Sequence, residues 1–321
     1  MSINLGKALA KISPPAGYFR SNRTRLLSAL TPKVGAYAKN ACVFLKSGED
    51  NDIHAEDSPE KLFCQENNLW WVSGCEAPNC YAVIELASGN CTLFVKKMEE
   101  SSKTWMTVLS DTDFVERLEI DTCLYLDGME AWFKEKNFDQ INILEGTNPY
   151  SGRHPIRPDF SWMSGYLVNK QVLYSTINEV RVHKTSDDLD LLRQVGKLGC
   201  EGHVFVMQNM KPGMSESHVQ SLFRLYGGYN MKSGVPYGEI AAAGQNGARL
   251  HYQTNMDDVN DGNMILFDGG FRVDMFCSDI TTTWPVNGKF TEKQAKWYNM
   301  VLAASKAVFG LAKPGIILHY F

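Results

Sequence analysis

The sequence predicts an α/β protein of two domains, and three observations support that prediction. The chain has 321 residues, enough for two hydrophobic cores, and a globular composition that is 44% hydrophobic and 21% charged. Strand-like and helical patterns alternate along residues 18–145. A loop-rich run at residues 146–160 is later followed by a well-capped helix. We therefore expect an N-terminal domain over residues 1–183 and a C-terminal domain over residues 184–321.

The elements of the N-terminal domain follow from periodicity and turn residues. Residues 81–86 and 91–95 are apolar, strand-prone runs on either side of ASGN, which predicts a β-hairpin. Residues 129–138 have helical spacing, and residues 141–146 have the pattern of a buried strand. No recognisable cofactor-binding loop appears in this half of the sequence.

Three helices are predicted in the C-terminal domain. Thr185 or Ser186 can cap the first helix, whose opening turn contains three aspartates that the helix dipole favours. The second is predicted over residues 218–226 and the third, a long one, over residues 291–312. Strand-like runs interrupted by glycine lie between the second and third helices.

Charge, hydropathy and cysteine spacing argue against several classes of protein. The net charge of −4 gives no argument for a nucleic-acid partner, and no apolar stretch approaches the roughly 20 residues of a membrane span. The eight cysteines include no CxxC pair, so neither a zinc ribbon nor a thioredoxin-type site is indicated. Residues 1–48 contain eight basic residues and no acidic one, which fits either a transit peptide or a basic surface helix. We expect a cytoplasmic protein with reduced thiols and no membrane partner.

Two aspartates, Asp268 and Asp279, lie eleven residues apart in the apolar, β-branched run 265–286. If the flanking strands pair with Asp268 opposite Asp279, both carboxylates lie on one face, with Cβ atoms about 4.5–5.5 Å apart. Carboxylates that close repel each other, and a bound dication such as Mn²⁺ or Mg²⁺ would neutralise them. A metal-free alternative fits the spacing equally well: Asp268 caps a turn at Gly269–Gly270, and Asp279 is solvated.

Residues 250–294 resemble the metal-binding first half of the Xaa-Pro dipeptidase (prolidase) and aminopeptidase P family of metallopeptidases. The family pattern HY…DG…D-x-G…SDITRTFPVNGKFT is matched almost residue for residue, and an E-x-R-x-x-K signature is present at residues 179–184. The similarity extends to residues 62–95 and to KTWM at residues 103–106. It covers nearly all of residues 18–315. The resemblance implies an N-terminal α/β creatinase/prolidase-like domain followed by about half of a pita-bread catalytic domain.

The resemblance also implies a function. Enzymes of the prolidase type hydrolyse the peptide bond before a C-terminal proline, through water activated by a dinuclear centre that usually holds two Mn²⁺ ions. Asp268 and Asp279 match metal ligands of that centre, and His251 matches a histidine that contacts the substrate and stabilises the developing charge. An Xaa-Pro dipeptide substrate and a homodimer are the partners that the resemblance implies.

Two residues depart from the family pattern in or near this segment. Gly269 stands where the family more often has alanine, and Asn263 replaces an aspartate outside the ligand set. Cys277 would share the ligand face if the strands pair as expected, but we interpret it as a core residue.

The largest departure follows Asp279. No HGxGH-like or EPG-like segment, from which the family takes its remaining ligands, is present, and the only later histidine and glutamate are His319 and Glu292. The chain therefore resembles a C-terminally truncated dipeptidase, and we expect residues 1–321 alone to be inactive. Two alternatives stay open: a catalytically dead pseudopeptidase that acts as a dimerising or binding module, and an aminopeptidase P-type exopeptidase.

Overall fold

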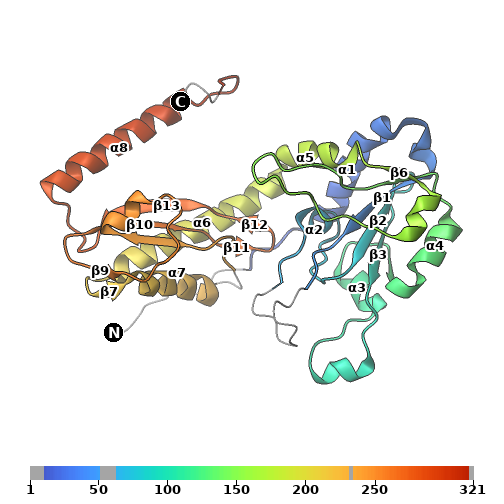
Figure 1. The fold of residues 1–321 in the computed structure, drawn as a ribbon, viewed down its shortest axis with the longest axis horizontal. Coiled ribbons are helices and arrows are strands. Elements are labelled where there is room, and N and C mark those ends of the chain that lie inside the picture. Colours follow the sequence, from blue (N-terminus) through green and yellow to red (C-terminus); the bar gives the residue numbers. More distant parts are fainter. Residues whose placement is uncertain (1–10, 51–62, 231–233, 318–321) are drawn as a thin grey trace. The chain divides into compact units, whose positions relative to one another are not determined.

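The computed structural model describes residues 11–50, 63–230 and 234–317. Contacts within the chain divide it into two compact units, Pro14–Asp187 and the residues from Asp188 onward. This division falls four residues after the predicted domain boundary between residues 183 and 184, which stays a prediction. Each unit has its own β-sheet and helices (Figure 1).

The unit Pro14–Asp187 is built on a six-stranded mixed sheet of order β4-β3-β2-β1-β5-β6. Its strands are β1 (Ala41–Lys46), β2 (Tyr81–Glu85), β3 (Cys91–Val95), β4 (Thr122–Tyr125), β5 (Gln140–Asn142) and β6 (Leu167–Asn169). β2 and β3 are antiparallel, with Tyr81 opposite Phe94, and they confirm the predicted hairpin. β5 confirms the predicted buried strand but ends at Asn142, earlier than the apolar run suggested.

The helices of this unit are α1 (Tyr18–Val34), α2 (Asn67–Ser73), α3 (Asp111–Arg117), α4 (Met129–Lys136) and α5 (Leu173–Val182), with short 3₁₀ turns η1 (Gly35–Asn40), η2 (Glu100–Thr104), η3 (Leu126–Gly128) and η4 (Ser161–Gly165). Side-chain acceptors satisfy amides at the start of three of these helices, α1, α2 and α3. Glu119 accepts hydrogen bonds from two amides at the start of α1, and Ser110 and Asp113 form a capping box on α3. α1 has Leu26 and Leu30 fully buried, so this part of the basic N-terminal segment belongs to the folded unit.

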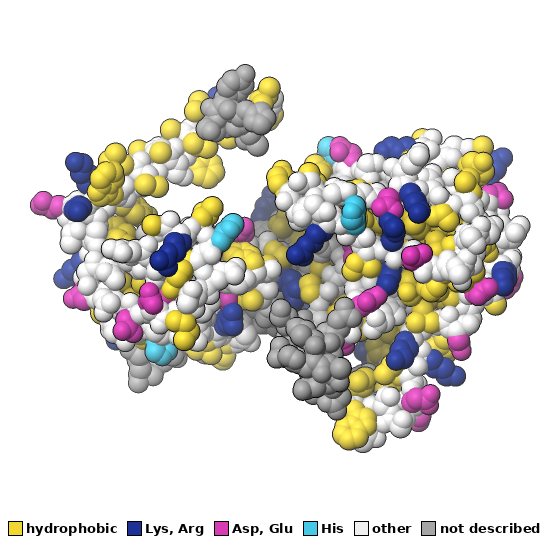
Figure 2. All heavy atoms as spheres, in the orientation of Figure 1, with side chains coloured by type: hydrophobic (Ala, Val, Ile, Leu, Met, Phe, Trp, Pro, Cys, Tyr) yellow, Lys and Arg dark blue, Asp and Glu magenta, His cyan; other side chains and the backbone are white. Residues whose placement is uncertain are grey.

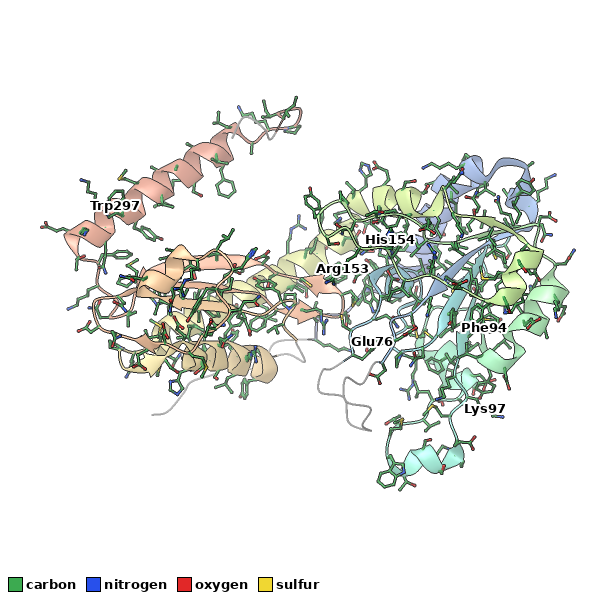
Figure 3. The ribbon with its side chains drawn as sticks, viewed as in Figure 1. Glu76, Phe94, Lys97, Arg153, His154 and Trp297 are labelled. Carbon is green, nitrogen blue, oxygen red and sulfur yellow. The ribbon has the colours of Figure 1, made fainter. Side chains whose placement is uncertain are left out.

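An aromatic cluster forms much of the core of the first unit. Phe44 of β1 lies 4.9 Å from Phe133 of α4 between ring centroids, and Phe133 lies 4.8 Å from Trp162. Phe94 of β3, labelled in Figure 3, is fully buried in the same cluster. Aromatic pairs at these separations add to the stabilisation from area burial, so this unit has a substantial core of its own.

The second unit places two helices on one face of a three-stranded antiparallel sheet. The sheet has the order β13-β10-β8. Its elements are α6 (Ser186–Asn209), β7 (Met214–Ser215), α7 (Glu216–Asn230), β8 (Ile240–Ala243), η5 (Gly244–Ala248), β9 (Asp258–Val259), β10 (Met264–Gly269), β11 (Arg272–Val273), β12 (Phe276–Cys277), β13 (Ile280–Pro285) and α8 (Glu292–Leu311). The three predicted helices correspond to α6, α7 and α8.

Alternation along β10 decides which side chains face these helices. Ile265, Phe267 and Gly269 are buried, whereas Leu266 and Asp268 are half-buried. Phe267 packs against Phe223 of α7 and His203 of α6, which places the helices on the face of Phe267. Because successive side chains of a strand point to opposite faces, Asp268 faces away from the helices.

α8 follows the sheet and buries none of its side chains in the described part of the chain. Thr291 and Gln294 form a capping box at its start, which fixes the first turn. Trp297, labelled in Figure 3, is 57% exposed, and further hydrophobic side chains line the helix in Figure 2. No helix among the described residues is long and apolar enough to cross a bilayer.

Candidate metal centre

The hairpin that carries the two aspartates has a different register from the predicted one. Asp268 pairs with Thr281, and not with Asp279, which directly precedes β13. The pairing continues to Arg272 opposite Cys277, so the two-residue turn lies at Asp274–Met275. A shift of two residues keeps each side chain on the same face, so Asp268 and Asp279 become diagonal neighbours on one side of the sheet.

The position of the turn explains this register. Asp274 has a φ of +49°, in the left-handed region that two-residue hairpin turns require and that aspartate adopts more readily than most residues. Gly270 allows the strands to approach closely beyond it, because a Cβ there would lie 1.9 Å from the carbonyl oxygen of Ser278. Ser278 also pairs with Phe271 through a backbone and a side-chain hydrogen bond.

Tyr237 brings the two carboxylates together. Its hydroxyl oxygen lies 2.7 Å from Oδ1 of Asp268 and 2.9 Å from Oδ1 of Asp279. The two Oδ1 atoms therefore lie no more than about 5.6 Å apart, the combined length of these hydrogen bonds. Asp268 is half-buried and Asp279 is exposed. Exposure of Asp279 agrees with the metal-free alternative, but its shared partner shows that the two side chains converge.

The protonation of Tyr237 follows from its surroundings. Burial, followed by the hydrogen bonds to Asp268 and Asp279, raises the pKa of Tyr237 well above its ordinary value. The phenol therefore remains protonated near neutral pH and acts as the donor to the carboxylates. Its neighbours in sequence give no indication of this role, because its partners lie 31 and 42 residues away along the chain.

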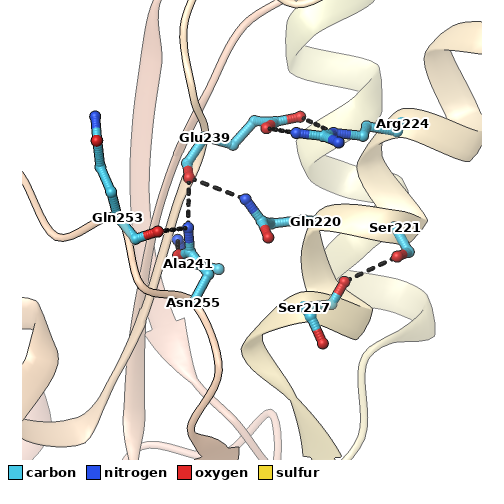
Figure 4. A network of polar contacts seen from close by, with 8 residues as sticks. All are labelled: Ser217, Gln220, Ser221, Arg224, Glu239, Ala241, Gln253 and Asn255. Carbon is cyan, nitrogen blue, oxygen red and sulfur yellow. Dashed lines mark hydrogen bonds and ion pairs between the residues drawn. The ribbon is translucent and has the colours of Figure 1, made fainter. Parts of the chain in front are cut away.

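An ion pair with a buried carboxylate fixes the segment that carries Tyr237 (Figure 4). Glu239 is fully buried, and its carboxylate accepts hydrogen bonds of 2.7 and 2.6 Å from the guanidinium of Arg224 on α7. The Glu239 carbonyl also accepts from the side chains of Gln220 and Asn255. Ile240, the next residue, pairs with Asp268. α7 thus holds the start of β8 beside the aspartate strand.

His203 supports the same hairpin from the helix side. Its Nε2 lies 3.0 Å from the carbonyl oxygen of Gly269, and its Nδ1 lies 2.7 Å from Oγ1 of Thr282. A carbonyl can only accept, so Nε2 carries a hydrogen and Nδ1 of the neutral ring accepts from the threonine hydroxyl. Burial lowers the pKa of His203, partly offset by the Gly269 hydrogen bond and the charge of Asp268. The neutral ring therefore links α6 to both β10 and β13.

His251 lies on the exposed loop between η5 and β9. Within the described ranges, no hydrogen bond joins it to Asp268 or Asp279, so the structure does not bring the three predicted residues into direct contact. The neighbouring Tyr252 is buried and donates to Oε2 of Glu216 over 2.7 Å. Burial and this hydrogen bond raise the pKa of Tyr252 to about 12.

Glu216 is the centre of a network that fixes the His251 loop. Besides the Tyr252 hydroxyl, the Glu216 carboxylate accepts from the amides of Ala243 and Asp257 and from the side chain of Asn246. Four donors therefore compensate the burial of this carboxylate. The network connects the start of α7 to β8 and to both ends of the loop on which His251 lies.

The interpretation of Cys277 as a core residue is wrong. Cys277 is exposed on β12. The reason is its position in the hairpin tip, which extends beyond the part of β10 that pairs with β8. The alternation of the strand places it on the same face as Asp279.

The carboxylate pair can supply part of a metal site. Carboxylate oxygens suit hard divalent ions, and two of them converge on one hydroxyl. Throughout residues 11–50, 63–230 and 234–317, however, no group of three or more His, Cys, Asp or Glu side chains is placed to hold a metal. Asp268 and Asp279 thus fit as two ligands, fewer than the four to six that such ions take.

Each of the two parts of the chain matches a known protein family. Residues 190–320 match metallopeptidase family M24, and residues 19–143 match the aminopeptidase P N-terminal domain. The Xaa-Pro dipeptidases of Homo sapiens and Pongo abelii are 36% identical to this chain over 97% of its residues. The chain spans 64% of the length of these relatives.

Solved structures show the same fold. The aminopeptidase PepP of Pseudomonas aeruginosa aligns with a TM-score of 0.78 and 21% identity, over 95% of this chain and 69% of that one. A zinc-substituted Escherichia coli aminopeptidase P in complex with product aligns with a TM-score of 0.75 and 22% identity, over 95% and 70%. The chain thus resembles metallopeptidase family M24 over residues 190–320 and the aminopeptidase P N-terminal domain over residues 19–143.

Proposed function

We propose that this chain supplies the N-terminal domain and two metal ligands of an Xaa-Pro dipeptidase. Such an enzyme hydrolyses the peptide bond before a C-terminal proline. The convergence of Asp268 and Asp279 on Tyr237 is the observation that carries the proposal. The names and 36% identity of the mammalian relatives support the choice of reaction.

Each residue of the site has a proposed role. Asp268 and Asp279 hold Mn²⁺ in a two-ion centre whose remaining ligands come from other groups. Divalent metals in hydrolases lower the pKa of bound water to about 7 and polarise the scissile carbonyl. Tyr237 fixes the orientation of both carboxylates, and His251 binds the substrate and stabilises negative charge that develops on the carbonyl oxygen.

The proposal extends to substrate, assembly and location. We propose an Xaa-Pro dipeptide as substrate, a homodimer as the assembly and the cytoplasm as the location, with no nucleic-acid or membrane partner. With the ligands of the centre completed, comparison of Gly-Pro with Gly-Pro-Ala separates a dipeptidase from an aminopeptidase P-type enzyme, because only the latter prefers the longer peptide. Light scattering coupled to gel filtration tests the dimer.

Mn²⁺ binding tests the metal ligands directly. Isothermal titration of residues 1–321 should detect binding that Asp268→Asn and Asp279→Asn each weaken by at least about tenfold, because each removes an anionic ligand. Asp258→Asn is the matched control, since Asp258 is an exposed aspartate on β9 of the same unit. If all three variants bind Mn²⁺ like the unaltered chain, Asp268 and Asp279 are not ligands.

Hydrolysis of Gly-Pro tests whether residues 1–321 are active on their own. The described residues bring only two ligands together, so residues 1–321 with Mn²⁺ should hydrolyse Gly-Pro no faster than Asp268→Asn. Faster hydrolysis would mean that other ligands complete the centre, for example from a second copy. Sequencing the transcript beyond codon 321 separates the candidates: an open frame with HGxGH-like and EPG-like segments favours the dipeptidase, and a stop favours the pseudopeptidase.

A further inference from the structure

Two buried thiols are in contact in the N-terminal unit. The Sγ atoms of Cys75 and Cys80 lie 3.8 Å apart, and neither residue has any exposed surface. Cys75 directly follows Gly74, which ends α2 in the left-handed conformation, and Cys80 directly precedes β2. The two side chains are therefore held by elements on either side of a short connecting loop.

The hydrogen bonds around the pair give the two thiols different acidities. The Cys80 thiol can donate to the sulfur of Cys75 or to the carbonyl of Ala77, 3.2 Å away. Donation from Cys80, together with the Ala77 amide, lowers the pKa of Cys75 in spite of its burial. The same contact and burial raise the pKa of Cys80. Because the Ala77 carbonyl can only accept, Cys80 keeps its proton in this contact, which leaves Cys75 as the nucleophile and Cys80 to resolve an oxidised Cys75.

The loop that connects Cys75 to Cys80 is only partly buried. Of the four residues between the cysteines, Glu76 and Asn79 are exposed, and Ala77 and Pro78 are half-buried. Figure 3 labels Glu76 in this loop. Displacement of these four residues alone would give a small oxidant access to the sulfur atoms, without opening the aromatic core.

We propose that Cys75 and Cys80 are a modification site, which closes to a disulfide when the protein meets a hydroperoxide such as hydrogen peroxide. The Cys75 thiolate attacks one peroxide oxygen, the O–O bond breaks, and the released hydroxide takes up a proton to form water. The Cys80 sulfur then attacks the Cys75 sulfenic acid, the S–O bond breaks, and hydroxide leaves as a second water with the Cys80 proton. In sum, two thiols and one peroxide give one disulfide and two waters.

The geometry makes this pairing specific. A disulfide has an S–S length of about 2.04 Å, so the two sulfur atoms need to approach by about 1.8 Å, which side-chain rotation and a small loop adjustment supply. Burial raises the pKa of both Cys91 and Cys123 to about 12, so these nearby thiols stay protonated and react slowly. The inference does not depend on the proposed peptidase function.

Peptide mapping tests the disulfide. Exposed thiols of the folded chain are first blocked with iodoacetamide, and hydrogen peroxide is then added in a buffer with a metal chelator. The protein is unfolded in N-ethylmaleimide and digested with a glutamyl endopeptidase, which cuts after Glu66, Glu76 and Glu85. We expect the fragments 67–76 and 77–85 to remain joined until a reductant is added, with a mass lower by two hydrogen atoms.

Variants test the roles of the two sulfur atoms. Cys80→Ser should accumulate a sulfenic acid on Cys75 that dimedone traps, whereas Cys75→Ser should give no dimedone adduct on Cys80. Cys91→Ala is the matched control, a buried cysteine of the same unit, and should still give joined fragments. Circular dichroism checks the fold of each variant, and the mapping of the unaltered chain decides if a variant does not fold. Separate fragments after peroxide, or a fragment joined through Cys91 or Cys123, would overturn the proposal.

Discussion

The phenol of Tyr237 has one hydrogen to donate and two carboxylate oxygens within hydrogen-bonding distance. Its raised pKa keeps that hydrogen in place, so the group lowers the repulsion between Asp268 and Asp279 without adding charge. It also restrains both side chains, as groups that hydrogen-bond to metal ligands commonly do. Tyr237 is therefore placed to keep the two ligands ready for a cation.

Tyr237→Phe should weaken Mn²⁺ binding by about 10- to 100-fold, the usual cost of losing a group that orients a metal ligand. Isothermal titration at fixed pH measures this change. Tyr226→Phe is the matched control, because its hydroxyl bonds to Glu201 and to neither aspartate. Equal Mn²⁺ affinity of the Tyr237→Phe variant and the control would show that the hydroxyl does not orient the ligands.

Only some residues of this site could be predicted from the sequence. Asp268 and Asp279 stand out because acidic residues are unusual in an apolar, strand-prone run. Tyr237, Glu239 and Glu216 could not be predicted in the same way. Their roles come from contacts between distant segments, such as the link of Glu216 to Tyr252, 36 residues away.

The β10–β13 hairpin shows which properties of an element its sequence determines. Alternation predicts the strands and the common face of the aspartates, because these depend on a period of two. The register depends on the turn, and Asp274–Met275 is not one of the strongly favoured Asn-Gly or Asp-Gly pairs. The centre of the hairpin therefore lies one residue later than predicted, and Asp268 pairs two residues beyond Asp279, with Thr281.

The contact between α7 and β8 depends on an asymmetric ion pair. Glu239 has no exposed side-chain surface, whereas the side chain of Arg224 is 57% exposed. Loss of the arginine leaves a buried carboxylate without its counter-ion, but loss of the carboxylate charge leaves a cation that water can solvate. The two deletions should therefore have unequal costs.

Arg224→Ala should lower the free energy of unfolding by about 2–3 kcal/mol, less than the roughly 3–5 kcal/mol for breaking a fully buried pair, because water can approach the carboxylate from the side of the half-exposed arginine. Glu239→Gln should cost about 1–2 kcal/mol, because the amide keeps the shape and can still accept one hydrogen bond. Urea unfolding of both variants and of the double variant measures these energies. A larger loss of unfolding free energy for Glu239→Gln than for Arg224→Ala would contradict the view that the carboxylate is the buried member of the pair.

At the scale of the whole molecule, each unit has its own core and its own sheet. The aromatic cluster of Pro14–Asp187 is formed within that unit, and the packing of Phe223, Phe267 and His203 is formed within the other. Units with separate cores often unfold in separate transitions, and a ligand stabilises only the unit that binds it.

Thermal unfolding of the whole chain should therefore show two transitions. A fragment of residues 14–187 should fold alone and reproduce one of them within about 4 °C, a difference that corresponds to less than about 2 kcal/mol for a domain of this size. Mn²⁺ at 100 times its dissociation constant should stabilise the other transition by about 2.7 kcal/mol and leave the fragment unchanged. Asp268→Asn should remove that shift while Asp258→Asn retains it. A single transition that moves as a whole with Mn²⁺ would show that the two units unfold together, and an Mn²⁺-dependent shift in the isolated fragment would place a metal site in the N-terminal unit.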